Sequence, residues 1–328
     1  MRVLGMGNAL VDVLAVIQND DLLREMNLPK GSMQLIDKDR FEKISEKIKG
    51  LNAEIVSGGS ASNTIVGLSR LGVRTGFIGR VGQDSFGKYY RNDLIAHKVT
   101  PLLSEVDEIS GVASTFISQD GERTFGTYLG AAALLGAEDL NERDFNGYDY
   151  FYIEGYLVQS YDLIRKALSL AKNAGLKTIL DFASYNVVED NREFLLEIIP
   201  QYVDIIFANE EEAKALYDVT PEEAVAMLAK EVELAIVKTG SKGSWVQRGE
   251  EKVFVPAHKV DCVDTTGAGD LYASGFIYGL TKGFPLNTCA QIGTLLAANV
   301  IQRIGAKIPE EKWQEVIPQI SQIILETC

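Results

Sequence analysis

A glycine-rich motif near the C-terminus carries the residues best placed to do chemistry. Residues 264–270 read DTTGAGD and are followed by a run with helical spacing and small residues. Gly267, Ala268 and Gly269 have little or no side chain, so their backbone N–H groups can point at an anion, and a helix that begins there adds its partial positive charge. The motif therefore predicts an anion hole for charge that develops in a transition state.

Asp270 lies at the edge of this predicted anion hole. A carboxylate in that position is well placed to take a proton from an attacking hydroxyl group, which makes Asp270 a candidate general base. The same aspartate also fits a structural role as a helix cap. In the context of the whole motif we favour the catalytic role.

A second glycine-rich segment, residues 57–64, reads SGGSASNT. Gly58 and Gly59 allow a polar ligand to approach backbone atoms closely. Asn63 offers both a donor and an acceptor, as a ligand with hydroxyl groups requires. The segment also fits a loop that caps a helix starting near Ser60, and such a helix does not exclude the ligand.

The first residues after the N-terminus read as a short strand, residues 3–5, that runs into a glycine-containing turn. The turn resembles the start of a dinucleotide-binding G-x-G-x-x-G fingerprint, but Leu10 stands where the third glycine belongs, which disfavours that fold. Asn8 and Asp12 follow the strand and are candidates for binding ligand hydroxyl groups. The chain contains neither a G-x-x-x-x-G-K-[ST] motif nor the protein-kinase signatures.

The elements that must position these motifs follow from hydrophobic periodicity. Apolar runs typical of strands alternate with amphipathic runs typical of helices. The expected strands are residues 149–153, 176–180, 203–207 and 234–237. The expected helices are residues 162–174, 194–199 and 210–217, with a further helix that has Pro221 in its first turn. This alternation is typical of a parallel sheet covered on both faces.

Two regions, residues 13–55 and 112–130, do not follow this alternation of strands and helices. They contain strand-like segments with polar interruptions. In the second region, residues 112–118 and 124–128 flank Asp120-Gly121, a hairpin turn signal. We interpret the two regions as a small β-rich lid, with surface decoration of the main sheet as the alternative. This divides the chain into lid segments 13–55 and 112–130 and a large α/β domain of residues 1–12, 56–111 and 131–328.

Polar residues stand at the ends of the expected strands. Glu154, Asp181, Asn209 and Thr239 each follow an apolar run. In parallel α/β sheets, ligands bind beyond the carboxyl ends of the strands. Simple termination of the strands would give the same pattern, so this observation adds little on its own.

Composition narrows the classes of partner. The 328 residues carry a formal net charge of −14, which makes nucleic-acid binding unfavourable while leaving room for a nucleotide ligand. No stretch reaches the length of a membrane span, and the N-terminus lacks the pattern of a signal peptide. We therefore expect a cytoplasmic protein that contacts neither membrane nor nucleic acid.

The two glycine-rich segments together resemble the signatures of the ribokinase-like carbohydrate kinases, the phosphofructokinase-B family. Residues 58–63 look like the N-terminal signature, residues 264–270 look like the C-terminal one, and Asn209-x-x-Glu212 is similar to the family's metal-linked N-x-x-E motif. The resemblance extends over essentially the whole chain. It implies a ribokinase-like three-layer α/β sandwich with a mostly parallel central sheet, a small β-sheet lid over the acceptor, and the use of ATP and Mg²⁺.

The resemblance also implies roles for individual residues in the acceptor half of the site. Asp270 matches the catalytic base, and Gly267, Ala268 and Gly269 match the anion hole. Arg123 matches a lid arginine that reaches the transferring phosphate. The residues matched to the acceptor are Asp12, which holds sugar hydroxyls, its neighbours Asn8, Gly58, Gly59 and Asn63, and Phe125 and Tyr156 as stand-ins for residues that stack on a base.

For the nucleotide, the resemblance places the ATP site within residues 131–328, together with the catalytic motif. Thr239, Gly240 and Gly243 match the strand end at the ATP phosphates, and Asn299 lies in the stretch that lines the adenine site. Asn209 and Glu212 are expected to act on Mg²⁺ mainly through water. Asp264 and Thr266 match a monovalent-cation site of ribokinases, which makes K⁺ a further candidate cofactor.

Within this family, several stretches look most like the adenosine-kinase branch, namely residues 5–16, 121–130, 151–158 and 297–305. This implies an ATP-dependent phosphotransferase that phosphorylates a hydroxymethyl group of a nucleoside, with adenosine as the first candidate. A sugar kinase of the ribokinase or fructokinase type is the alternative. An inactive ligand-binding relative is a third hypothesis, disfavoured by the intact Asp270. The expected partners are small-molecule substrates, with the chain as a monomer or a homodimer through the lid.

Overall fold

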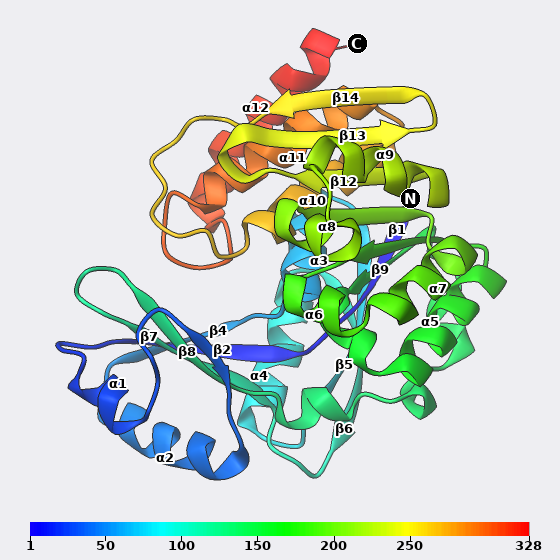
Figure 1. Ribbon diagram of the computed structural model, residues 1–328. Helices are drawn as coiled ribbons and strands as arrows, with labels where there is room; N and C mark the ends of the chain where they lie inside the picture. Colours follow the sequence, from blue (N-terminus) through cyan, green and yellow to red (C-terminus); the bar gives the residue numbers. More distant parts are fainter. Residues whose placement is uncertain (328) are drawn as a thin grey trace.

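The computed structural model describes residues 1–327 and contains two β-sheets (Figure 1). The larger sheet has nine strands. In order across the sheet they are β14 (Glu251–Pro256), β13 (Gly243–Arg248), β12 (Leu234–Lys238), β11 (Ile205–Asn209), β10 (Lys177–Asp181), β9 (Tyr150–Glu154), β1 (Arg2–Met6), β5 (Arg74–Gly82) and β6 (Val99–Val106). Every neighbouring pair from β12 to β6 is parallel, and β13 and β14 are antiparallel additions at one edge.

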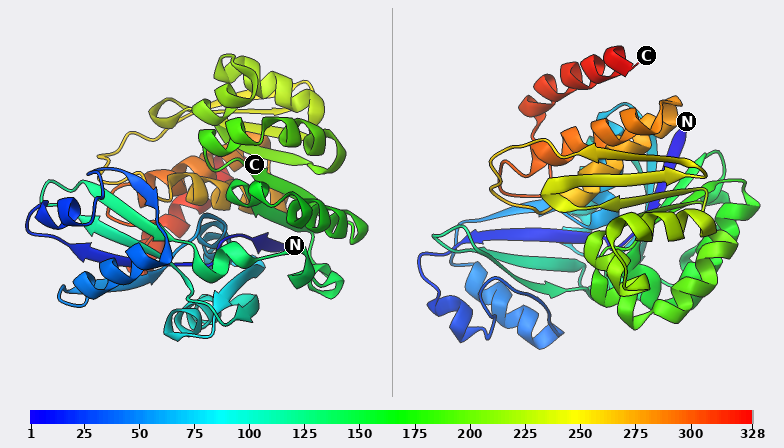
Figure 2. Two further views of the ribbon diagram at one scale, coloured as in Figure 1. Left: turned by 60° about the horizontal axis from the view of Figure 1, so that its bottom comes forward. Right: turned by 45° about the horizontal axis from the view of Figure 1, so that its top comes forward.

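Helices cover both faces of this sheet, which makes a three-layer sandwich. One face is covered by α5 (Tyr161–Asn173), α6 (Tyr185–Asp190), α7 (Arg192–Tyr202), α8 (Glu210–Tyr217) and α9 (Pro221–Glu231). The other is covered by α3 (Ser60–Arg70), α4 (Ser85–Ala96), α10 (Ala268–Lys282) and α11 (Leu286–Val300). The last helix, α12 (Glu310–Thr327), packs its first turns on α11, and its end projects from the body (Figure 2).

Short 3₁₀ helices fill the connections between these elements. They are η1 (Gly130–Leu134), η2 (Ala137–Asp139), η3 (Glu142–Phe145), η4 (Gly155–Gln159) and η5 (Gly240–Lys242). No helix within residues 1–327 is long and apolar enough to cross a membrane. The predicted fold class and the predicted strands and helices of the large domain are confirmed.

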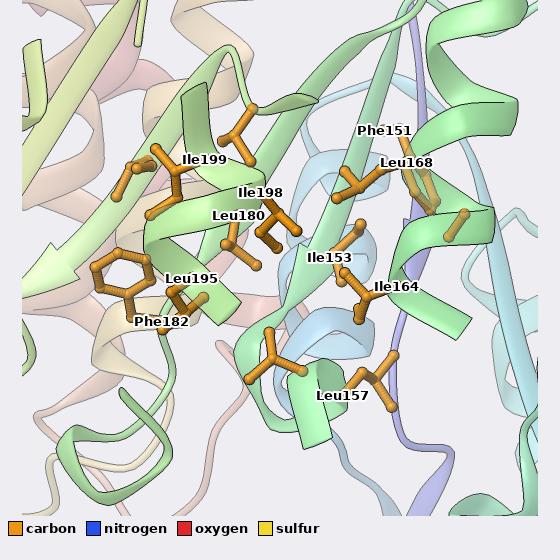
Figure 3. Packing of buried hydrophobic residues seen from close by; sticks show 14 of the residues in the cluster. Phe151, Ile153, Leu157, Ile164, Leu168, Leu180, Phe182, Leu195, Ile198 and Ile199 are labelled. Atoms are coloured by element: carbon orange, nitrogen blue, oxygen red, sulfur yellow. The ribbon is translucent and has the colours of Figure 1, made fainter. Parts of the chain in front are cut away.

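The central strands are apolar at successive positions because both of their faces are buried. Phe151 and Ile153 of β9 pack with α5 and α7, as Figure 3 shows, whereas Tyr152 between them points to the layer of α3 and α10. Leu180 of β10 lies in the same cluster as Phe151. This double burial explains why the strands read as continuous runs rather than as an alternating pattern.

The smaller sheet has five strands and stands beside the sandwich (Figures 1 and 2). In order they are β3 (Met33–Leu35), β8 (Arg123–Tyr128), β7 (Gly111–Ile117), β2 (Leu10–Val16) and β4 (Ala53–Ser57). One face is covered by α1 (Asp21–Glu25) and α2 (Lys38–Ile48), which bury Phe41 and Ile44 against Phe116. We call this sheet with α1 and α2 the lid, and the expected hairpin at Asp120-Gly121 joins β7 to β8.

The lid strands extend slightly beyond the expected segments 13–55 and 112–130. β2 begins at Leu10, so Asp12 lies on the lid and not at the end of a strand of the large domain, and β4 runs to Ser57. The change of sheet between β1 and β2 takes only three residues, Gly7 to Ala9. The glycine-containing turn marks the end of β1, but nothing in the sequence shows that β2 joins a different sheet.

The packing around β10 gives a test of the core. Leu180 is 1% exposed, and truncation to alanine removes buried methyl groups and leaves a cavity, so we expect Leu180→Ala to lower the free energy of unfolding by about 2–5 kcal/mol. Urea unfolding followed by circular dichroism measures this. The matched control is Leu196→Ala on α7, where the side chain is 37% exposed and the loss should stay below about 0.5 kcal/mol. Equal losses in the two variants would contradict the packing described here.

Candidate active site

The glycine-rich motif forms the entry to α10. Gly267 stands before the helix with φ +77°, a left-handed conformation that favours glycine, and a Cβ there would lie 2.7 Å from the backbone of Ala306. The helix then begins at Ala268, whose N–H donates to Thr265 O at 3.1 Å. The N–H groups of Gly269 and Asp270 have no partner within the helix, so these two are the ones placed to receive an anion.

Asp270 lies in the first turn of α10, but its carboxylate does not cap that helix. Its Oδ1 accepts a hydrogen bond from Ser60 Oγ at 2.7 Å, and its Oδ2 accepts one from Asn63 Nδ2 at 2.9 Å. Burial raises the pKa of Asp270 to about 6, although the two hydrogen bonds act to lower it. A carboxylate fixed by two donors, with a pKa near neutrality, has the properties of a general base.

Asn63 lies directly beside Asp270. Its amide nitrogen holds Asp270, and its Oδ1 is buried without a hydrogen-bond partner. Ser60, at the start of α3, holds the other oxygen and was not among the predicted site residues. The sequence gives no signal for this arrangement, because Asn63 and Asp270 are 207 residues apart.

Asn8 and Gly59 lie where the chain passes from the body to the lid. Asn8 donates its backbone N–H and its amide N–H to Glu154 Oε1, at 2.8 and 2.9 Å, and Ala61 N donates to Glu154 Oε2 at 2.9 Å. Gly59 has φ +90°, and a Cβ there would lie 2.3 Å from the carbonyl oxygen of Asn8. Burial raises the pKa of Glu154 to about 7 against these hydrogen bonds. Glu154, seen in the sequence only as a polar strand end, thus anchors the turn after β1 and the start of α3.

Asp12 lies on the lid face opposite to α1 and α2. Register places Asp12 beside Ala113, Ala113 beside Thr127, and Thr127 beside Leu35, so these side chains form one row across the sheet. The carboxylate of Asp12 lies against Gly58, where a Cβ would meet it at 2.6 Å. Burial raises the pKa of Asp12 to about 6.

Arg123 and Phe125 project to the same lid face, because they alternate with Thr127 along β8. Phe125 pairs with Met33 and Thr115 across the lid. Tyr156 belongs to the body instead, in η4, directly after β9. The structure thus places the two predicted stacking residues on different sides of the site.

Arg123 crosses from the lid to the loop before α10. Its Nη1 lies 2.9 Å from Asp264 Oδ2, with both side chains 9% exposed, and it donates to Thr266 Oγ1 at 3.2 Å. Asp264 also accepts hydrogen bonds from Thr266 N, Thr266 Oγ1 and Gly305 N. Its oxygens are therefore fully engaged, and the guanidinium group stands where a monovalent cation was expected. Nε and Nη2 of Arg123 are buried without a partner and remain free for an anion.

Asn209 and Glu212 form a closed capping box at the start of α8. Asn209 Oδ1 accepts from the backbone of Glu212, while Glu212 accepts from Asn209 N and Nδ2, both at 2.7 Å. Burial raises the pKa of Glu212. No group of three or more His, Cys, Asp or Glu side chains in residues 1–327 is arranged to hold a metal ion by itself.

A cavity of about 360 Å³ opens on the other side of the anion hole. Gly240 and Gly243 line it, as do Ala257, Val260, Ala268, Ala297, Ala298 and Ile301. Thr239 lies just behind and donates its hydroxyl to Gly243 O at 2.9 Å. Asn299 does not line the cavity. Its amide donates to Leu295 O within α11, and its neighbours Ala297 and Ala298 face the cavity instead.

The architecture described above is the ribokinase-like fold, with Asp270 and the glycine-rich entry to α10 at the carboxyl edge of the sheet. The sequence pattern of the pfkB family carbohydrate kinases matches residues 28–313. Adenosine kinase of Saccharomyces cerevisiae is 30% identical over 330 residues, which cover 94% of this chain and 96% of that protein. Ribokinase of Haemophilus influenzae is 27% identical over 286 residues, which cover 84% of this chain and 91% of that protein.

Solved structures agree with the sequence matches. Adenosine kinase from Sinorhizobium meliloti aligns with a TM-score of 0.85 and 37% identity, over 97% of this chain and 98% of that one. A probable sugar kinase from Rhizobium etli aligns with a TM-score of 0.86 and 33% identity, over 98% of both chains. The chain belongs to the pfkB family of carbohydrate kinases. It is a nucleoside or carbohydrate kinase, and kinases of this family use ATP with Mg²⁺.

The hydrogen bonds to Asp270 predict the pH dependence of the reaction. A base must be unprotonated, so kcat/KM should fall as the pH is lowered through about 6, the pKa of Asp270. Asn63→Ala removes a donor that favours the charged form, so the acid limb should move to higher pH by about one unit. Asn173→Ala, on the exposed surface of α5, is the control. An acid limb at the same pH in both variants would contradict the role of Asn63.

Proposed function

We propose that the protein is an ATP-dependent phosphotransferase that phosphorylates the hydroxymethyl group of a nucleoside, with adenosine as the first candidate. The observation that carries this proposal is the pairing of a buried, doubly hydrogen-bonded Asp270 with the lid face that bears Asp12. The two carboxylates are close enough for the charge of Asp270 to raise the pKa of Asp12. A base and a hydroxyl-binding group on facing elements define where a sugar would lie.

In the transfer step the protein forms no covalent bond to the substrates and acts mainly by positioning them and stabilising charge. The acceptor oxygen forms a bond to the γ-phosphorus, the bond from that phosphorus to the β,γ-bridging oxygen breaks, and Asp270 takes the acceptor proton. The N–H groups at the start of α10 stabilise the charge on the transferring group. Arg123 supports the same group from the lid side through its unpartnered Nε and Nη2.

The row of side chains across the lid supports a nucleoside acceptor. Asp12, Ala113, Thr127 and Leu35 lie on successive strands, and strands are about 4.8 Å apart, so Leu35 is roughly 14 Å from Asp12. Leu35 and Thr127 line a cavity of about 260 Å³ together with Ile36, Tyr128, Leu129, Gly130, Ala133 and Leu134, and with Glu108 as its one acidic residue. A largely apolar cavity with one carboxylate at that distance from the sugar-binding carboxylate suits a flat heteroaromatic base with hydrogen-bonding edges.

A sugar acceptor of the ribokinase or fructokinase type is the second candidate, and ribokinase is among the relatives. Such an acceptor would leave the lid cavity empty and would need polar groups in place of Leu35 and Leu129. The monomer and the lid-mediated dimer both remain compatible with this function.

Mg²⁺ fits the site as an ion that arrives with ATP. Asn209 and Glu212 satisfy each other, so they are placed to hold water around the ion rather than to replace its water ligands. Bound in this way, Mg²⁺ supplies charge neutralisation for the phosphate oxygens. The side-chain oxygens of Asp264 and Thr266 are engaged by hydrogen bonds and by Arg123, so we propose that these side chains do not ligate K⁺.

Acceptor choice is tested by steady-state kinetics with ATP and Mg²⁺ on adenosine, inosine, ribose and fructose. We expect adenosine to have the highest kcat/KM. Asp270→Asn is the control for contaminating kinases and should lower kcat by about 10²–10⁴-fold while ATP still binds. A tenfold preference for ribose or fructose would replace the nucleoside assignment with a sugar kinase. An Asp270→Asn turnover within threefold of the parent would remove Asp270 as the base.

The role of Glu212 is tested by Mg²⁺ titration of the rate. Glu212→Gln keeps the shape but loses the charge that attracts the hydrated ion, so the Mg²⁺ concentration for half-maximal rate should rise several-fold. The matched control is Glu223→Gln, in the exposed capping box with Thr220 at the start of α9, which should change nothing. If both variants show the parental Mg²⁺ dependence, Glu212 acts only as a helix cap.

A further inference from the structure

Lys238 is a buried cation at the carboxyl edge of the large sheet that the roles described above do not use. It is the last residue of β12 and pairs in register with Asn209, the first residue of the capping box. Its side chain is 16% exposed, and its Nζ lies 6.0 Å from the centre of the Phe207 ring. A strand-end lysine of this kind usually extends into solvent, so its burial requires an explanation.

The ammonium group lies against the anion hole. A Cβ added to Gly269 would stand 3.3 Å from Lys238 Nζ, which places the ammonium beside the first turn of α10. The N-terminus of a helix is itself positive, so a cation at that point is unfavourable unless negative charge lies between them. Two sources of positive charge that converge on one point define a site for an anion.

The carboxylate partner of Lys238 uses only part of the hydrogen-bonding capacity of the ammonium group. Nζ lies 3.3 and 3.5 Å from the two oxygens of Asp181, which is longer than the 2.7–2.9 Å typical of a charged hydrogen bond. Within residues 1–327, Asp181 is its only hydrogen-bond partner, although an ammonium has three donors. Burial acts to lower the pKa of Lys238, but Asp181 and Glu212 raise it above its usual value, so the group stays charged.

We propose that Lys238 is a catalytic residue that donates hydrogen bonds to the terminal phosphoryl group of the nucleotide while it is transferred. This rests on the proposed function and adds a cation on the nucleotide side of the anion hole, opposite Arg123 of the lid. The ammonium keeps its protons throughout, because the acceptor proton goes to Asp270. In the loose transition state negative charge is spread over the three equatorial oxygens of the transferring group and develops on the leaving oxygen, and a lysine serves there as a compact point charge.

The competing explanation is that Lys238 only neutralises the buried carboxylate of Asp181. Four variants separate the two roles: Lys238→Met, Lys238→Arg, Asp181→Asn, and the double variant Lys238→Met/Asp181→Asn. The control is Lys252→Met on β14, a lysine that is also paired with a carboxylate, Glu222, and lies 5.0 Å from the Trp245 ring, away from the site.

The proposal predicts that Lys238→Met lowers kcat by about 10²-fold, as loss of one transition-state donor does, and that Lys238→Arg recovers part of this. Calorimetry with a non-hydrolysable ATP analogue and with ADP should show roughly tenfold or greater loss of affinity for the analogue and little change for ADP. The double variant should remain impaired. Lys252→Met should match the parent in every measurement.

Three results would overturn the role of Lys238. They are parental turnover in the double variant, equal losses of affinity for ADP and for the ATP analogue, and parental turnover in Lys238→Met itself. If Lys238→Met alone does not fold, the double variant, which leaves no unpaired buried charge, answers the question. Calorimetry needs no acceptor, so absence of kinase activity in the parent would count against the proposed function and leave the result on Lys238 readable.

Discussion

Two hydrogen bonds from α3 to Asp270 hold the site together, and they depend on how closely α3 and α10 approach. The helices touch through small residues: a Cβ on Gly67 would lie 2.4 Å from Ser274 Oγ, and that hydroxyl donates to the carbonyl oxygen of Thr64 at 2.9 Å. Larger side chains would separate the helices and move Ser60 and Asn63 away from the carboxylate. The orientation of the Asp270 carboxylate is therefore set by packing in the body and not by the lid.

The second constraint is electrostatic. Asp12, Glu154 and Asp270 are buried near one another, and burial raises the pKa of each, so their charged forms are costly without nearby donors. Backbone N–H groups of Asn8 and Ala61 bond Glu154, Lys307 and Arg123 act to lower the pKa of Asp12, and Lys238 acts to lower that of Asp270. This local arrangement lets a chain with a net charge of −14 bind a polyanionic nucleotide at one point of its surface.

Much of this could be read from the sequence, for identifiable reasons. The strands and helices of the large domain follow from periodicity, and the anion hole follows from glycines beside a helix start. What the sequence could not supply were the long-range partners: Asn63 with Asp270, and Arg123 with Thr266 at a separation of 143 residues. Glu154 stood among the polar strand ends, a pattern that strand termination explains equally well, and Lys238 was not singled out at all. Only the tertiary contacts show which of those ends converge on one point.

The lid is assembled from strands that are remote in the chain, and this fixes an order in which the protein can be built. β2 pairs with β4 nearby, but its other neighbour is β7, so Leu10 lies beside Gly111 across the parallel pair. During synthesis, one edge of β2 must therefore stay unpaired until residues beyond Ile117 have emerged from the ribosome. The intervening elements α3, β5 and α4 can form earlier, because β5 pairs with β1, which is already synthesised. An open, apolar strand edge is prone to wrong pairing. During synthesis, the lid is thus the part of the chain that exposes an unpaired strand edge for longest.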